Sequence, residues 1–174
     1  TAATDTTLSG TTRMFIDSAG KVGIGTTVPL ANVDISGANV VTNSRGNLFI
    51  RTNDSYAINK GGQITFGGIY TGTSNAGWAS VAGRKENGGN NDYSAYLSFG
   101  TAANGGNLTE KMRITSTGNV GIGTTSPVAK LHVYTGDSGF NATTNGDELF
   151  IESSGHAGMT IGSGTTSQGN IFFG

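Results

Sequence analysis

Two pairs of carboxylates come nearest to a catalytic pattern in this chain. Glu86 precedes Asp92 in a Gly/Asn-rich segment, and Asp147 is followed directly by Glu148. Cleavage of a polysaccharide needs two carboxylates about 5 to 10 Å apart beside a sugar groove, one as acid and one as base or nucleophile. Carboxylates in turns are usually solvated caps, and the sequence lacks the long solenoid that holds such a groove. We therefore assign no catalytic residue and expect no enzyme.

The histidines and glycines do not form a recognisable metal or phosphate site. His132 and His156 lie far apart without i+4 partners, and the chain has no cysteine. His132 alternates with Leu131 and Val133, which predicts a surface residue on a strand rather than a ligand. The glycines of V-G-I-G-T-T lack the lysine and the following helix of a phosphate-binding loop. We expect neither a metal nor a cofactor.

Residues 70–96 are the one candidate for recognition of a ligand. They include the chain's only tryptophan, Trp78, together with Tyr93, Arg84 and Lys85. Exposed aromatic side chains beside polar turns can stack on sugar rings or anchor a protein interface. The alternative is that Trp78 fills the core of an oligomer, in a chain with few large apolar residues.

An internal repeat defines the elements that would hold these residues. Residues 14–37 (MFIDSAGKVGIGTTVPLANVDISG) align without a gap with residues 112–135 (MRITSTGNVGIGTTSPVAKLHVYT), and 12 of the 24 positions are identical. The motif V-G-I-G-T-T-x-P is the best preserved part. Leu48–Ile50 recurs as Leu149–Ile151, and residues 62–67 recur at 169–174. Such a long-period repeat predicts a modular, extended scaffold rather than a globular catalyst.

The repeated motif is interpreted as an assembly element. In an extended chain the β-branched residues lie on one face and the glycines on the other, so the glycines indicate a backbone pressed close to another segment. Three such strands around an axis would point the β-branched residues inward, and proline would fix the exit direction. The competing interpretation is a pair of edge strands in two separate β-sandwich domains. The predicted assembly residues are Val22, Gly23, Ile24, Gly25, Pro29, Val120, Gly121, Ile122, Gly123 and Pro127.

The composition also favours an oligomer. Leu, Ile, Val and Phe number 36 of 174 residues, whereas glycine alone numbers 30. One copy would struggle to offset the entropy of ordering its backbone, about 1 to 2 kcal/mol per residue, so several copies should share a core. Nucleic acid is not an expected partner, because 10 basic residues face 11 acidic ones without a basic cluster. No apolar run is long enough to insert into a membrane, and both ends of the sequence suggest a segment of a longer protein.

The expected fold class is all-β. No window of 11 or more residues has a helical apolar pattern free of glycine, whereas short period-two segments recur between turn clusters. The repeat divides the chain into residues 1–37, the end of one module, residues 38–135, a full module, and residues 136–174, the start of a truncated one. The strongest expected strands are 64–66, 78–82, 95–99, 112–114, 120–122 and 129–133.

Residues 110–133, EKMRITSTGNVGIGTTSPVAKLHV, resemble the segment ERMRI-x-x-x-GNVGIGTTSP-x-x-x-LHV of bacteriophage tail fibres and tailspikes. The resemblance is good over residues 61–135, clear over 13–37 and weak elsewhere. In the first copy Asp34 replaces His132 and Asn32 replaces Lys130, so these positions are expected to be exposed and free to vary. The pair Glu110 and Arg113 is expected to be an interchain ion pair or a solvated edge.

The resemblance implies an elongated, intertwined homotrimer of β-prism or triple-β-helix-like modules, often followed by a self-cleaving chaperone domain. The chain would then be a virion structural protein, extracellular and located in a tail or side fibre. Its partners would be its own copies, other virion or baseplate proteins, and a host-cell glycan or protein. The alternatives are a fragment of a polysaccharide-depolymerising tailspike and a trimeric bacterial surface adhesin or extracellular filament.

Overall fold

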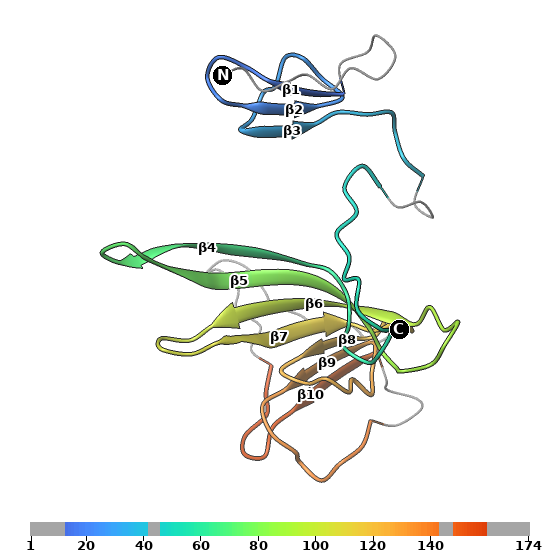
Figure 1. The fold of residues 1–174 in the computed structure, drawn as a ribbon. Helices are drawn as coiled ribbons and strands as arrows, with labels where there is room; N and C mark the ends of the chain where they lie inside the picture. Colours follow the sequence, from blue (N-terminus) through green and yellow to red (C-terminus); the bar gives the residue numbers. More distant parts are fainter. Residues whose placement is uncertain (1–12, 42–45, 143–147, 160–174) are drawn as a thin grey trace, which may run out of the picture. The chain divides into compact units, whose positions relative to one another are not determined.

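The computed structural model describes residues 13–41, 46–142 and 148–159. The chain divides into two compact units, Thr1–Ile50 and Arg51–Gly174, which are treated separately below. Every regular element of the described residues is a β-strand, and none of them is a helix (Figure 1). The expected all-β fold class is therefore confirmed.

The first unit contains one small mixed sheet. Strands β1 (Met14–Ile16) and β2 (Val22–Ile24) form an antiparallel hairpin, and β3 (Val33–Ile35) lies parallel to β2 on its other side. The order across the sheet is β1-β2-β3. A parallel neighbour immediately after a hairpin requires the chain to cross back over the sheet, and residues 25–32 make this connection.

The second unit contains a seven-stranded sheet, in which neighbours from β4 to β8 are antiparallel whereas β8, β9 and β10 are parallel (Figure 1). Register shifts lie in the pairings of β4 with β5 and of β6 with β7, where β-bulges interrupt the ladder. The strands are β4 (Gln63–Thr71), β5 (Ser74–Lys85), β6 (Ala95–Ala102), β7 (Leu108–Ile114), β8 (Val120–Ile122), β9 (Leu131–Tyr134) and β10 (Leu149–Glu152).

The two sequence repeats fold in the same way. The last part of β7, with β8 and β9, repeats the order, directions and register of β1, β2 and β3. In the first copy the Asp17 amide donates to the Lys21 carbonyl across the tight turn, at 3.0 Å, and in the second the Thr115 amide donates to the Asn119 carbonyl, at 2.9 Å. The repeat thus encodes a three-strand module of mixed direction.

The motif glycines are required within the chain itself. Gly25 and Gly123 have φ of +77° and +78°. A Cβ on Gly25 would stand 2.2 Å from the carbonyl oxygen of Ser36, just after β3, and one on Gly123 would stand 2.2 Å from that of Tyr134 in β9. A Cβ on Gly23 would stand 2.3 Å from the Thr26 carbonyl oxygen, and one on Gly121 would stand 2.6 Å from that of Thr124. The close approach inferred from the sequence is therefore made by the chain's own loop and neighbouring strand.

Each of the six expected strands overlaps an observed strand, although most of the observed strands are longer. The repeated tripeptide behaves differently in its two copies. Leu149–Ile151 begins β10, whereas Leu48–Ile50 has no strand structure. The recurrence of residues 62–67 at 169–174 lies outside the described residues.

Neither unit has an ordinary hydrophobic core among its described residues. Over the ranges that the structure describes, the buried apolar side chains are those of Ala82, Tyr96, Ala129 and Pro29, and many large apolar residues remain exposed. A sheet in which one face packs on nothing leaves most of its hydrophobic stabilisation unused. The distribution of apolar side chains between the two faces of the sheet therefore shows which face lacks a packing partner.

Candidate assembly interface

One face of the seven-stranded sheet, here called the apolar face, carries a continuous apolar row. Residues opposite one another in register project from the same face, and the row takes one residue from every strand. Its members are Ile64, Val81, Phe99, Met112, Ile122, Val133 and Ile151. No polar residue interrupts the row from one edge of the sheet to the other.

A second apolar row runs beside the first, on the same face. It comprises Leu97, Ile114, Val120, Leu131 and Leu149. The apolar face is only partly covered, since Phe66 is 56% exposed and Leu149 49%. An exposed apolar surface of this continuity is typical of a protein interface.

The first unit repeats this arrangement on a smaller scale. Met14, Ile24 and Ile35 form one cross-strand row, and Ile16, Val22 and Val33 form the next. Met14 and Val33 are more than half exposed. Each copy of the module therefore has one apolar face that is only partly covered.

The predicted assembly residues divide between the two faces. Val22, Ile24, Val120 and Ile122 lie on the apolar faces, as the alternation predicts. Gly23 and Gly121 lie on the opposite faces, where both are buried. Pro29 is also buried, and Pro127 is half-buried near the position that a Cβ on Gly121 would occupy. Val81, Met112 and Ile151 also belong to this surface, and sequence reasoning did not place them there. The signal was the alternation of apolar residues along the strand that carries each of them.

The opposite face, the polar face, is closed by interactions within the chain. The Arg113 side chain donates to both carboxylate oxygens of Glu110 and lies 4.0 Å from the centre of the Tyr96 ring. Tyr96 in turn donates its hydroxyl hydrogen to Asn59 Oδ1 at 2.8 Å. The hydrogen bond with Glu110 is the main reason that the pKa of Arg113 is raised. The expectation of an interchain or solvated Arg113–Glu110 pair was wrong, because the pair is half-buried within one chain.

His132 is a buried member of the polar face, which corrects its expected surface position. Its side chain faces Gly121 on one side and Phe150 on the other, so it is covered although it is polar. His132 Nε2 lies 3.0 Å from Glu152 Oε2, and Nδ1 has no hydrogen-bond partner. Its counterpart Asp34 is half-buried, so the expectation of two exposed, freely varying positions failed here. Asn32 and Lys130 are exposed, as expected.

Glu152 joins the loop after β9 to strand β10. Its Oε1 accepts hydrogen bonds from the Ser138 amide, at 2.9 Å, and from the Ser138 hydroxyl, at 2.8 Å. These bonds, the amide bond first, lower the pKa of Glu152 from 4.5, and the contact with His132 lowers it further. Sequence reasoning did not find this carboxylate, although it directly follows the repeated tripeptide.

We predict that the contribution of Glu152 to stability is lost in acid. Because its folded-state pKa is lowered, the contribution is complete above the ordinary value of 4.5 and is lost as the pH falls through the folded value. Urea midpoints of the wild type and of Glu152→Gln should differ clearly near neutral pH and converge as the pH falls well below 4.5. A gap of constant size over this range would contradict the prediction.

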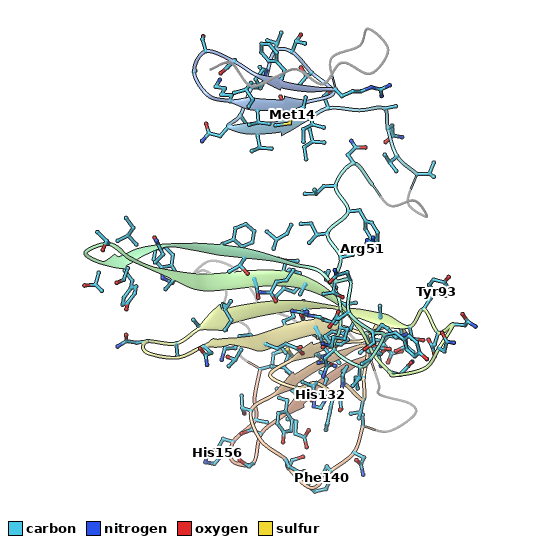
Figure 2. The ribbon with its side chains drawn as sticks, in the orientation of Figure 1. Met14, Arg51, Tyr93, His132, Phe140 and His156 are labelled. Carbon is cyan, nitrogen blue, oxygen red and sulfur yellow. The ribbon has the colours of Figure 1, made fainter. Side chains whose placement is uncertain are left out.

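The three predicted recognition residues do not form one cluster. Arg84 donates to the Gly61 carbonyl, at 2.9 Å, and to Gln63 Oε1. Tyr93 is 96% exposed on the loop between β5 and β6 (Figure 2). Trp78 lies six residues before Arg84 on β5, which corresponds to about 20 Å along a strand. Only Tyr93 is fully presented to solvent.

Trp78 belongs to the apolar side of the sheet. It sits at the bulge between β4 and β5, and its ring lies 2.7 Å from where a Cβ of Gly68 would be. Gly68 follows Phe66 by two residues and so shares the apolar face. Trp78 and Tyr70 also line a shallow depression of about 520 Å³, to which no charged residue contributes. This position fits the alternative interpretation of Trp78 as part of an oligomer core.

The candidate catalytic carboxylates that the structure describes are either exposed or hydrogen-bonded to loop residues. Glu86 accepts hydrogen bonds from the Ser116 amide and hydroxyl. Asp92 accepts from the Ser94 amide at 2.7 Å, and this bond is the main cause of its lowered pKa. Glu148 is exposed, and Asp147 lies outside the described residues. Over the described residues, no group of three His, Cys, Asp or Glu side chains could hold a metal ion.

In comparisons with known proteins, no family model and no curated sequence matched this chain. Within the described ranges there is also no helix of the length and apolarity needed to cross a membrane.

Proposed function

We propose that this chain is a shaft segment of a bacteriophage tail or side fibre that works as a homotrimer. The observation that carries the proposal is the division of the sheet into an apolar face that is only partly covered and a polar face whose main side chains are hydrogen-bonded within the chain. Three such sheets, with their apolar faces turned toward a common axis, would form a prism. The Arg113, Tyr96 and His132 clusters would then lie on its outside, where most of their polar atoms are already paired within each chain.

The two parts of the proposal have different support. The uncovered apolar row supports association of copies, because it offers each sheet the core that it lacks alone. Two copies packed face to face would also cover this row. The number three, the fibre and the virion come from the resemblance of residues 110–133 to phage fibre shafts. No observation on the described residues favours the depolymerase or the adhesin instead.

In this proposal the shaft contributes to host attachment through repetition of its surface. Three identical outer faces would multiply weak contacts with a host-cell glycan or protein. The loop that carries Tyr93 is the proposed place for such contacts, because it is exposed outside the apolar face. Other virion or baseplate proteins would be the remaining partners. The chemistry proposed for the chain uses no cofactor.

Native mass spectrometry of the 174-residue chain tests the oligomer directly. We expect a mass three times that of one chain, and small-angle scattering that shows an elongated particle. The trimer should persist on dilution, because obligate oligomers of this kind have little stability as single chains. A folded, stable monomer would refute the proposal, and a dimer would refute the trimeric shaft.

A further inference from the structure

The second unit contains two copies of the tripeptide Asn-Gly-Gly, each in a connection between strands. Asn87 begins the first copy, in the loop between β5 and β6, and Asn104 begins the second, in the turn between β6 and β7. A further Asn-Gly pair, at residues 145–146, lies outside the described residues. Asparagine is a chemically labile residue, and a following glycine has no side chain to shield its backbone nitrogen.

The relevant reaction is deamidation through a cyclic imide. The amide nitrogen of the glycine, after loss of its proton, attacks Cγ of the preceding asparagine. A new bond forms between nitrogen and Cγ, the bond from Cγ to Nδ2 breaks, and Nδ2 takes up a proton and leaves as ammonia. Water then opens the imide at either carbonyl carbon and leaves aspartate or isoaspartate. Hydrogen bonds that fix the asparagine side chain or the next peptide group oppose the attack, because both must rotate.

Asn104 has no such restraint among the described residues. Its side chain is exposed and makes no hydrogen bond to another described residue. The turn is closed by a backbone bond from the Gly106 amide to the Ala103 carbonyl, at 3.0 Å, which leaves the peptide group between Asn104 and Gly105 without a partner in the described part of the chain. Gly105 has φ of +70°, and no atom beyond its two neighbours lies within 4 Å of its Cβ position. The imide ring therefore has room to form.

Asn87 is followed by the same two residues, but its side chain is held. Its Nδ2 donates to Asp92 Oδ2 at 2.9 Å, and its Oδ1 accepts from the Gly89 amide at 2.8 Å. Asn87 is also half-buried. The bond to Asp92 fixes the nitrogen that would have to leave, and the carboxylate opposes negative charge on the carbon attacked by Gly88.

We propose that Asn104 is a site of spontaneous deamidation in the folded protein, whereas Asn87 is protected by its own loop. The two asparagines share the same following residues, so their difference in rate comes from the fold. Deamidation of the first needs only rotation within an open turn. Deamidation of the second needs the loop to release its hydrogen bonds first.

The reaction would change an uncharged surface. Asn104 lines the shallow depression of about 520 Å³ that also contains Trp78 and Tyr70, to which no charged residue contributes. Either product places a carboxylate there, and isoaspartate also adds one methylene to the backbone of the turn. The inference uses contacts within the second unit and does not depend on the proposed fibre, so each can fail while the other stands.

Peptide mapping by mass spectrometry tests the proposal on the folded 174-residue chain. The chain is kept in mildly alkaline buffer, sampled over time and digested in acid, so that the digestion itself adds no deamidation. Exchange of an amino group for a hydroxyl group gives the mass change that marks each event. We expect Asn104 to react about tenfold faster than Asn87 in the folded chain, because hydrogen bonds hold only the latter. In urea the two rates should agree within about threefold.

Equal rates in the folded chain, or a faster reaction at Asn87, would overturn the proposal. So would a ratio in urea as large as that in the folded chain, because the difference would then not come from the fold.

Two variants assign the effect to its residues. Asp92→Ala removes the acceptor of Asn87 Nδ2 and should raise the rate at Asn87 by about threefold to tenfold, with the rate at Asn104 unchanged. An unchanged rate at Asn87 would overturn the protective role of Asp92. Asn104→Gln lengthens the side chain, so attack would form a larger and much less favoured ring. Its peptide should keep its mass, and a mass change at the wild-type rate would overturn the assignment to Asn104.

Discussion

Ile64→Glu is expected to prevent trimer formation. Ile64 begins the seven-strand apolar row on the edge strand β4 and is 44% exposed in the single chain, so the change places a charge within the proposed interface. The lost burial is worth about 2 kcal/mol for each copy, or about 6 kcal/mol for three copies, which corresponds to roughly a 10⁴-fold weaker association. Desolvation of the carboxylate adds to this loss. Sedimentation velocity over a dilution series measures the effect.

Thr65→Glu is the matched control for this substitution. Thr65 is the next residue of β4, is also exposed, and pairs with Ser80 on the polar face. The same charge one residue further along should leave the trimer intact, because side chains alternate between faces. Equal dissociation by the two variants would show that the apolar face is not the interface.

Gly123→Ala is expected to be among the most destabilising single-methyl changes in the chain. Gly123 has φ of +78°, and the new Cβ would stand 2.2 Å from the carbonyl oxygen of Tyr134. The left-handed conformation costs an alanine about 1 to 2 kcal/mol, and the forced backbone shift adds about 1 to 3 kcal/mol. Thermal unfolding at a fixed protein concentration should show a Tm lower by roughly 5 to 15 °C.

Gly118→Ala separates the two contributions. Gly118 has nearly the same φ, +81°, but no atom lies within 4 Å of the Cβ position. It should therefore show the conformational cost alone, about 1 to 2 kcal/mol. The pair Gly20 and Gly25 repeats this comparison in the first module. Equal losses for Gly118→Ala and Gly123→Ala would mean that the neighbouring carbonyl can move away freely.

Local patterns in the sequence predicted much of the fold. Alternation at Val120–Ile122 and Ala95–Phe99 predicted strands. Tight turns were expected around Gly105 and Gly118, and the structure has them between β6 and β7 and between β7 and β8. These features depend on neighbours in the chain. The period-two pattern also implied one apolar and one polar face for each strand, which the register confirms.

The features that sequence reasoning missed depend on pairing between distant residues. His132 alternates with apolar neighbours like a surface residue, and only the docking of β10 and of the loop at Ser138 buries it. Arg113 and Glu110 were expected to form an interchain ion pair or a solvated edge. The Arg113 guanidinium instead packs against the ring of Tyr96 within its own chain. The parallel direction of β9 depends on the path of the loop over Gly121, which no local pattern specifies.

The bare apolar face also bears on how the chain folds. If copies associate through this face as proposed, each sheet gains most of its stabilisation in an encounter between chains, so the rate of folding should rise with protein concentration. Until that encounter, the apolar face and the edges of β4 and β10, which pair with no further strand among the described residues, are available for unproductive pairing. Yield on refolding should therefore be highest at an intermediate concentration, where correct association is faster than aggregation.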